Sequence, residues 1–316
     1  MILVTLGTQD KEFRRLLEEI DRLIDNGVIK DKVVVQAGMT KYESDNMEIH
    51  SILPKEEFDK YIKDCDLLIT HGGVGSIITG LKDGKKVIAV PRLMKYKEHQ
   101  SNHQIEIVNI FNNNGYIIGV NDVSELSDAL SRVKKFKPKK YETDNSLMIK
   151  IVSENLKENK RVLFISSTGG HLEELMSFKP LFNKYNYHII TEKTESNILL
   201  KKKYKDKIDY LIYGTKVHPF IYIIKLLLNG FKSLYFYIKL RPKYIVTTGT
   251  HTAIPMCILG KMFGSKIIYI ETFANINSKT QTGNFIYKHK LYNVFIVQWE
   301  EMLKQYPKAT YGGSIF

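Results

Sequence analysis

The sequence predicts an α/β protein made of two doubly wound domains, each a parallel sheet with helices on both faces. Short β-branched runs alternate along the chain with amphipathic stretches of about 10–15 residues, the pattern of βαβ units. The alternation occurs twice, and a charged segment containing proline separates the two series. With 316 residues, 43% hydrophobic and 26% charged, the chain has the length of two globular domains and is too apolar to be disordered.

The first half contains five strand–helix repeats. The expected strands are 2–6, 32–36, 67–70, 86–90 and 116–119, and the expected helices lie around 12–25, 55–64, 75–83, 100–112 and 122–135. Residues 134–160 then supply a run of charge, Pro138 and a further helical stretch. We therefore place a boundary in this segment and predict domains at 1–158 and 159–316.

The second half repeats the scheme. Its expected strands are 161–166, 187–191, 210–213, 244–248, 266–270 and 293–297, with helical stretches between them. Doubly wound sheets bind ligands at the carboxyl ends of their strands. Two such domains therefore predict a binding cleft toward which both sheets direct those ends.

The excess positive charge is confined to the second half. Residues 1–158 contain 24 Lys and Arg against 25 Asp and Glu, whereas residues 159–316 contain 23 against 9, so the halves carry −1 and +14. This asymmetry predicts an anionic partner for the second half, either nucleic acid or a membrane surface. The alternative is a basic face that is only solvated.

Two further features bear on the compartment. Cys65 and Cys257 lie in or beside apolar stretches, which predicts reduced thiols of a cytosolic protein. The first residues lack the basic and long apolar regions of a signal peptide. We also expect no plain transmembrane helix, because no run of about 18 uncharged apolar residues occurs.

A glycine-rich turn follows the strand at 67–70. Glycines at a helix start let backbone amides approach a phosphate, so we predict an anion site there. The residues are His71, Gly72, Gly73, Gly75 and Ser76, joined by Gly7, Thr8 and Gln9 after the first strand. The spacing fits neither a nucleoside triphosphatase loop nor a dinucleotide fingerprint. Packing alone is the alternative.

A loop with several cations and amides follows the strand at 86–90. Its members are Arg92, Lys95, Lys97, His99, His103 and Gln104, and they are predicted to complete a diphosphate or sugar site. A solvated loop is the alternative. The histidine pairs also suggest zinc, but no cysteine is nearby and no HExxH motif occurs, so we predict no metal site.

Polar turns follow three strands of the second half. ISSTGGHLEEL (165–175) contains His171 after two glycines, TTGTH (247–251) contains a second glycine turn, and Glu271 ends the strand at 266–270. Carboxyl ends of parallel strands lie at one edge, so these groups are expected to converge. A histidine near its ordinary pKa, or a carboxylate with a pKa raised by burial, suits deprotonation of a sugar hydroxyl.

The segment 217–243 is apolar, basic and free of acidic residues. Lys225, Lys232 and Lys239 recur every seven residues, on one helical face, and Asn229-Gly230 predicts a kink or two short helices. We predict an interfacial membrane helix whose contacts include Phe220, Tyr222, Leu228, Phe231, Tyr235 and Phe236 as well as the three lysines. A buried core helix is the alternative. Nucleic acid is disfavoured because the aromatics accompany long aliphatic runs.

These motifs together resemble GT-B glycosyltransferases of the MurG kind. The second half is similar in RVLFISSTGGH, TTGTHTAIP and KIIYIETFAN to their acceptor-side domain, and to the membrane-associated subunit of two-subunit GlcNAc and bacterial exopolysaccharide transferases. The first half resembles the donor-binding subunit in VTLGTQ, CDLLITHGGVGSI, GKKVIAVPR and KYKEHQSNHQ, which adds Glu98 to the donor residues. The chain thus resembles both subunits fused with the donor domain first, a permuted GT-B order.

The resemblance implies an inverting, metal-independent transfer from a UDP-sugar to a polyprenyl-diphosphate-linked monosaccharide, by a monotopic protein on the cytoplasmic membrane face. It implies His171 as general base, with Glu271 as rival or partner. The acceptor residues it implies are Gly169, Gly170, Gly249, Thr250, His251 and Asn275. No cofactor beyond the donor and no nucleic acid are expected.

Capsule or exopolysaccharide synthesis is the favoured pathway, and a GlcNAc transferase making lipid-linked chitobiose is the first alternative. A UDP-sugar epimerase and a non-catalytic sugar-nucleotide sensor are further alternatives. One position departs from the family. A glutamate that holds the ribose in MurG-like donor domains is Thr79 here, so ribose recognition differs or is shared with Gln104.

Overall fold

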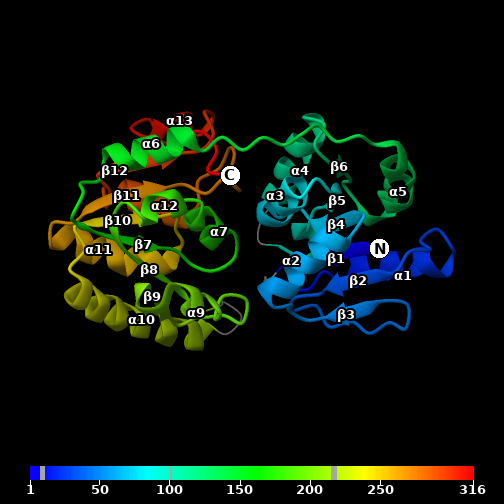
Figure 1. Cartoon of the computed structure of the whole chain (residues 1–316), viewed down its shortest axis with the longest axis horizontal. Helices are drawn as coiled ribbons and strands as arrows, with labels where there is room; N and C mark the ends of the chain where they lie inside the picture. Colours follow the sequence, from blue (N-terminus) through cyan, green and yellow to red (C-terminus); the bar gives the residue numbers. More distant parts are fainter. Residues whose placement is uncertain (8–10, 100–101, 215–218) are drawn as a thin grey trace. The chain divides into compact units, whose positions relative to one another are not determined.

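The computed structural model describes the chain except residues 8–10, 100–101 and 215–218, and it divides into two compact units, Met1–Glu142 and Thr143–Phe316 (Figure 1). Each unit is a parallel sheet packed between helices. The predicted fold class is therefore confirmed.

The sheet of the first unit has the order β3-β2-β1-β4-β5-β6 over the described residues, with parallel pairing throughout. Its strands are β1 (Ile2–Thr5), β2 (Val33–Gln36), β3 (Glu48–His50), β4 (Leu67–His71), β5 (Lys86–Val90) and β6 (Ile118–Gly119). Its helices are α1 (Arg14–Asp25), α2 (Lys55–Asp64), α3 (Val74–Lys82), α4 (His103–Asn113) and α5 (Leu126–Lys135). The strand order reverses between β1 and β4, so the loops after these two strands flank the switch point where such folds bind ligands.

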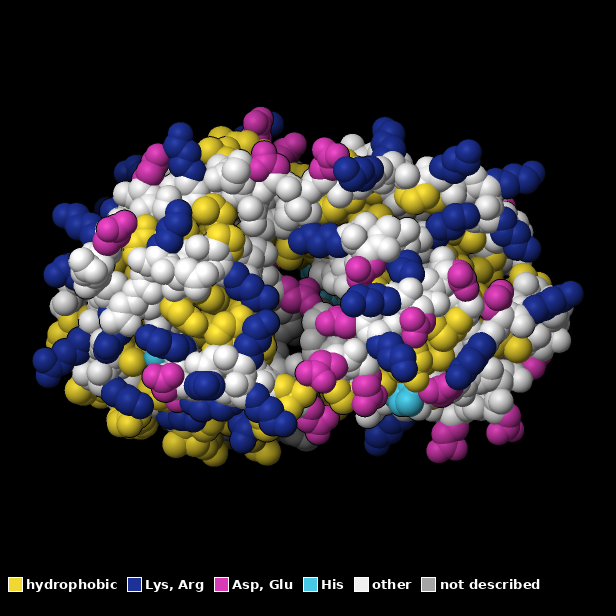
Figure 2. Space-filling model, viewed as in Figure 1, with side chains coloured by type: hydrophobic (Ala, Val, Ile, Leu, Met, Phe, Trp, Pro, Cys, Tyr) yellow, Lys and Arg dark blue, Asp and Glu magenta, His cyan; other side chains and the backbone are white. Residues whose placement is uncertain are grey.

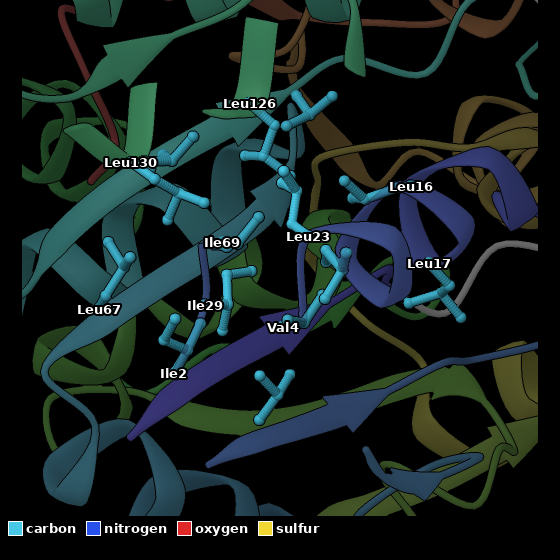
Figure 3. Close-up of a cluster of buried hydrophobic side chains, with 14 of the residues drawn as sticks. Ile2, Val4, Leu16, Leu17, Leu23, Ile29, Leu67, Ile69, Leu126 and Leu130 are labelled. Atoms are coloured by element: carbon cyan, nitrogen blue, oxygen red, sulfur yellow. The ribbon is translucent and has the colours of Figure 1, made fainter. Parts of the chain in front are cut away.

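Alternate residues of the central strands build the core of this unit. Ile2 and Val4 of β1 and Ile69 of β4 point to the face that α1 and α5 cover, where they are buried with leucines of both helices (Figure 3). Leu3 and the other residues of opposite parity lie on the second face, also fully buried. Burial on both faces explains why these strands are continuous apolar runs.

The second unit has a longer sheet, with the order β13-β12-β11-β10-β7-β8-β9 among the residues that the structure describes. Its strands are β7 (Arg161–Ile165), β8 (Asn186–Glu192), β9 (Ile208–Leu211), β10 (Tyr244–Thr247), β11 (Lys266–Ile270), β12 (Val294–Val297) and β13 (Thr310–Tyr311). Its helices are α6 (Ser146–Glu154), α7 (Gly170–Met176), α8 (Lys179–Phe182), α9 (Leu200–Tyr204), α10 (Pro219–Leu240), α11 (Ile254–Met262), α12 (Gln281–Lys288) and α13 (Met302–Gln305). Here the switch point lies between β7 and β10.

The boundary between the two units follows residue 142, sixteen residues before the predicted boundary after residue 158, because α6 packs on the second unit. Met148 and Val152 of α6 are fully buried, and the hydroxyl of Tyr185 donates to the carbonyl of Ser153 at 3.3 Å. The charged linker predicted that the chain divides in this segment. The apolar face of α6 determines that this helix packs on the second unit.

Two strands were not predicted from the sequence. β3 and β13 contain three and two residues, so they are too short to show an alternating pattern. The predicted helix at 100–112 begins at His103 as α4, and the other strands agree with the prediction to within about two residues, the usual uncertainty of an element boundary.

Candidate active site

In the first unit, the turn after β4 is packed around a buried imidazole. A Cβ atom at Gly7 or at Gly73 would lie 2.5 Å from ring atoms of His71, so both glycines are needed to make room for this side chain. Gly72 similarly faces Val108 of α4. Burial, and then the charge of Arg92, lower the pKa of His71 to about 3, so the ring is neutral at physiological pH. Thr8 and Gln9 lie outside the described residues.

The first turn of α3 follows this packed glycine turn. Gly75 and Ser76 are half-buried there, the first turn holds no acidic residue, and no side chain caps the helix. The amide groups at such a helix start carry partial positive charge, which favours an anion. The amides at residues 74–76 therefore remain the candidate phosphate site, whereas the glycines before them make room for neighbouring side chains.

Arg92 does not present its guanidinium to a ligand in this structure. It is 1% exposed, and its Nη atoms donate to the backbone carbonyls of Leu6 and Lys11, both at 2.7 Å. These bonds hold the residues after β1 against the end of β5. The prediction that Arg92 contacts a diphosphate is therefore corrected: the structure gives it a role in positioning the loop.

Other members of the 91–104 loop also hold the chain together. Glu98 is buried and accepts from Arg15 at 2.8 Å and from the amide of Leu93 at 2.9 Å. Gln104, 2% exposed, accepts from the amide of Arg92 at 2.9 Å, and His99 packs edge-on against His103. Lys97 is exposed and so remains a cation that a ligand can reach.

In the second unit, the turns after β7 and β10 touch each other across the switch point. The Nδ1 atom of His171 lies 2.8 Å from the carbonyl oxygen of Thr248, and the hydroxyl of Thr248 donates to the carbonyl of His171 at 2.7 Å. A carbonyl accepts only, so this contact assigns the proton to Nδ1 and leaves the lone pair on Nε2. Gly249, with φ +90, lies beside the ring. The predicted convergence of these two turns is present.

His171 has the properties of a base at this edge. Its side chain is 28% exposed, and burial lowers its pKa while the bond to Thr248 opposes that shift. The ring is therefore neutral at physiological pH, with Nε2 able to accept a proton.

A buried carboxyl that the sequence did not indicate lies beside this histidine. Glu174 lies one turn further along α7, with Oε2 3.7 Å from Nδ1 of His171. Burial raises the pKa of Glu174 to about 8, although bonds from the amide of Phe273 and the hydroxyl of Thr272 oppose the shift. The carboxyl is thus protonated at neutral pH, and the contact is not an ion pair. Its i, i+3 spacing from His171 was the available signal.

Glu271 is sealed beneath α12. Its carboxyl accepts from the hydroxyls of Tyr306 and Thr280, both at 2.9 Å, and from the amide of Thr272 at 3.1 Å. Burial raises its pKa, and the side chain is 1% exposed. The prediction of a rival base is therefore corrected: these donors and its burial make Glu271 an anchor for the loop after β11.

The remaining predicted acceptor residues divide into two groups. His251, after β10, lies with Nε2 3.9 Å from Oε1 of Glu192, whose pKa burial raises to about 7. The ring of His251 also packs edge-on against Tyr222 of α10. Gly169, Gly170 and Thr250 lie in the same pair of turns as His171, whereas Asn275 donates to Ser278 and so closes its own loop.

Helix α10 is one continuous helix of 22 residues, so the prediction of two short helices divided at Asn229-Gly230 is wrong. The side chain of Asn229 both accepts from and donates to the backbone of Ile212, each at 2.8 Å, which fixes the helix beside the end of β9. The asparagine therefore anchors the helix from within.

One side of α10 packs on the unit and the other is exposed and apolar. Phe220 is 85% and Phe231 71% exposed, and Leu228 and Tyr235 are exposed too. Figure 2 shows apolar side chains along the lower edge, where Figure 1 places α10. Phe236 is buried, so this predicted membrane contact is corrected, whereas Tyr222 is half-buried and stays a prediction.

The predicted lysine stripe is uneven. Lys232 donates to the carbonyl of Tyr210 at 2.8 Å, Lys225 is half-buried and Lys239 is exposed.

By length and composition, Phe220–Leu240 qualifies as a membrane span, with a mean hydropathy of 1.2 and 22% of its apolar window buried. This finding rests on length and composition, and the expectation of no plain transmembrane helix stays a prediction. The low buried share also argues against the alternative of a core helix. Separately, the described residues contain no grouping of three or more His, Cys, Asp or Glu side chains placed to hold a metal ion.

Comparison with known families finds a separate match for each half of the chain. Residues 1–159 match the family described as glycosyltransferase family 28 C-terminal domain, and residues 162–315 match the family described as oligosaccharide biosynthesis protein Alg14 like. The two matches together cover nearly the whole chain, in the order that the sequence motifs predicted.

Individual relatives match each half separately. Over 188 residues the chain is 27% identical to the UDP-N-acetylglucosamine transferase subunit ALG14 of Debaryomyces hansenii, covering 52% of this chain and 79% of that protein. Over 91 residues it is 35% identical to the subunit ALG13 of Candida glabrata, covering 28% and 44%. Among solved structures, MurG of Acinetobacter baumannii is similar at 17% identity and a TM-score of 0.36, over 44% of this chain and 41% of that one.

Proposed function

The chain belongs to the family of the glycosyltransferase family 28 C-terminal domain and carries an Alg14-like second half, and from this membership we propose that it moves a sugar from a UDP-sugar to a polyprenyl-diphosphate-linked monosaccharide. The resemblance that the motifs predicted is thereby confirmed, and the chain is a glycosyltransferase. The acceptor class, the pathway and the membrane face are parts of the proposal.

We propose UDP-GlcNAc as the first donor to test. Relatives of both halves are named as subunits of UDP-N-acetylglucosamine transferase. Thr79 has no carboxylate that could hold a ribose, and its hydroxyl donates to the carbonyl of Gly75 at 2.8 Å within α3. Glucose, galactose and glucuronic acid donors of exopolysaccharide synthesis therefore stay in the same screen.

The orientation of His171 is the observation that carries the mechanism. The carbonyl of Thr248 holds Nδ1–H, so Nε2 receives the proton of the acceptor hydroxyl while the oxygen attacks C1 of the donor sugar. The bond from C1 to UDP breaks on the opposite face and UDP leaves with the electron pair, which inverts the anomeric centre. Glu174 lies beside the imidazole as a neutral neighbour, 3.7 Å from Nδ1.

The leaving UDP needs stabilisation of its developing charge. The amides at residues 74–76 and the exposed Lys97 supply partial and full positive charge without a metal ion. Metal independence is part of the proposal, and its check is unchanged turnover in a chelator.

The exposed apolar side of α10 supports the proposal that the protein binds to a membrane surface. Its aromatic and aliphatic side chains suit burial at the boundary of headgroups and acyl chains, and the net charge of +14 on residues 159–316 attracts anionic lipids. We propose attachment at the cytoplasmic face, where a nucleotide sugar and a lipid-linked acceptor meet.

The test measures UDP release with and without a polyprenyl-diphosphate monosaccharide, in wild type and in His171→Ala. Release that depends on the lipid acceptor, together with a fall in kcat of about 10²–10⁴-fold in the variant, is expected for a general base. A loss below about threefold would remove His171 from that role. Release without any acceptor would point to an epimerase, and binding without release to a sensor. His289→Ala, an exposed histidine of the same unit, is the matched control.

A further inference from the structure

A two-part hollow opens at the edge of the second sheet opposite to His171. One part, of about 330 Å³, lies where β10 and β11 begin and is lined by Lys243, Tyr244, Lys261, Gly264, Ser265, Lys266 and Asn293. His171 follows the carboxyl end of β7, whereas Tyr244 and Lys266 are the first residues of their strands. Since the strands are parallel, the hollow and the candidate active site lie at opposite edges of the sheet.

The first part is strongly basic. Three of its residues are lysines, and none of the described residues that line it is acidic. Lys243 and Lys261 are exposed, and Lys266 donates to Asn155 at 2.8 Å while still reaching the wall. Lysine side chains repel one another when they are close together, so a shared anion stabilises such a cluster.

The second part is mainly apolar and lies beside the first. It has a volume of about 430 Å³ and shares Lys243 and Gly264 with the basic part. Its other walls are Tyr237, Ile238, Arg241, Pro242 and Phe263. Again no acidic residue occurs among the described residues that line it.

The apolar part runs into the exposed side of α10. Ile238 is exposed near the end of that helix, and Met262 and Phe263 are exposed at the end of α11, which packs against α10. A free phosphate would use the lysines alone, whereas a phosphate joined to an acyl chain would use both parts and continue along the helix.

We propose that this hollow binds one anionic phospholipid, with its phosphate between Lys243, Lys261 and Lys266 and an acyl chain against Phe263 and Ile238. A helix of 22 residues is about 33 Å long. The lipid therefore fixes the far end of α10 at the membrane, at the opposite end from Tyr222 and His251. The proposal concerns lipid binding and does not depend on sugar transfer.

The test compares binding of the full chain to phosphatidylcholine vesicles with and without phosphatidylglycerol. Lys243→Gln/Lys261→Gln should weaken binding to the anionic vesicles about tenfold or more. Lys304→Gln/Lys308→Gln removes equal charge from exposed sites near β13 and should change it less than about twofold. Equal losses in both double variants would overturn the proposal in favour of a diffuse surface charge. Lys243→Arg/Lys261→Arg, which keeps the charge, should retain binding and guards against a folding defect.

A second measurement separates a lipid from a free phosphate. Short-chain phosphatidylglycerol, glycerol phosphate and inorganic phosphate are titrated against wild type and Phe263→Ser. The lipid should bind wild type at least about tenfold more tightly than either soluble phosphate, and Phe263→Ser should remove most of that preference. Equal affinity for the lipid and inorganic phosphate would overturn the proposal and leave a phosphate site.

Discussion

The two glycines before His171 are present for different physical reasons. Gly169 has φ +69, a backbone conformation that side chains with a Cβ rarely adopt, and it caps the start of α7. A Cβ at Gly170 would meet nothing within 4 Å apart from its chain neighbours, so packing does not require the second glycine. The turn itself needs only the first, and the predicted role of Gly170 in acceptor binding stays a prediction.

Alanine substitutions are expected to separate these roles. Gly169→Ala should lower the free energy of unfolding by about 1 kcal/mol, because the backbone stays in the left-handed region. Gly170→Ala should leave thermal stability unchanged while raising KM for the lipid acceptor. Thermal melts and steady-state kinetics on both variants check this, and an unchanged KM in Gly170→Ala would show that the open space is not used.

The buried carboxyl of Glu174 makes stability depend on pH. Its pKa of about 8 in the folded chain exceeds the ordinary 4.5, so the unfolded chain loses this proton first as the pH rises. The folded state then binds more protons than the unfolded state, and the free energy of unfolding falls between those two pH values. Glu192, with a pKa of about 7, acts in the same direction.

Glu174→Gln should flatten this dependence. The amide keeps an oxygen for Thr272 and Phe273 but does not ionise, so the melting temperature should fall less between about pH 5 and about pH 8 than in wild type. Glu173→Gln, an exposed neighbour on the same helix, is the control and should follow wild type. Parallel curves for wild type and Glu174→Gln would contradict the assignment.

At the scale of elements, α10 combines two requirements in one helix. Asn229, Phe236, Tyr237 and Leu240 attach it to the unit, and its opposite side exposes large apolar residues. The sequence showed the apolar and basic composition, yet the asparagine that suggested a kink is a buried anchor. Its two hydrogen bonds to the backbone of Ile212 hold the helix beside the end of β9.

Exposed residues of α10 should matter for membranes and not for folding. Phe220→Ser/Phe231→Ser should weaken vesicle binding about tenfold or more, because each ring buries apolar area in the bilayer interface. The melting temperature should remain close to that of wild type, since both rings are exposed in the structure. Val28→Ser/Met39→Ser, exposed apolar positions of the first unit, serve as the control. A large loss of stability with unchanged vesicle binding would support the core-helix alternative.

At the scale of the whole molecule, the family match and the packing disagree about α6. The match to the first family extends to residue 159, whereas the contacts place everything from Thr143 onward in the second unit. A helix follows its buried face, and the apolar face of α6 lies on the second sheet. The last element of the donor-type half therefore stabilises the acceptor-type half.

Fragments are expected to show this dependence. A fragment of residues 143–316 should be more stable than 159–316 by about 4 kcal/mol or more, because the shorter one lacks the buried Met148 and Val152. A fragment of residues 1–142 should be as stable as 1–158. Denaturant unfolding of all four checks both statements, and the reverse ranking would place α6 with the first unit.

The sequence by itself determined the strand–helix order, the division of charge, the paired glycine turns and the family, because periodicity and local backbone requirements are written in consecutive residues. The prediction of His171 as the base came from these turns. The tertiary structure alone decided that Glu174 lies beside it, that Arg92 and Glu271 are held by the chain, and that α6 belongs with the second unit. Those outcomes depend on which distant groups become buried together, and burial and long-range hydrogen bonds have no signature in a short stretch of sequence.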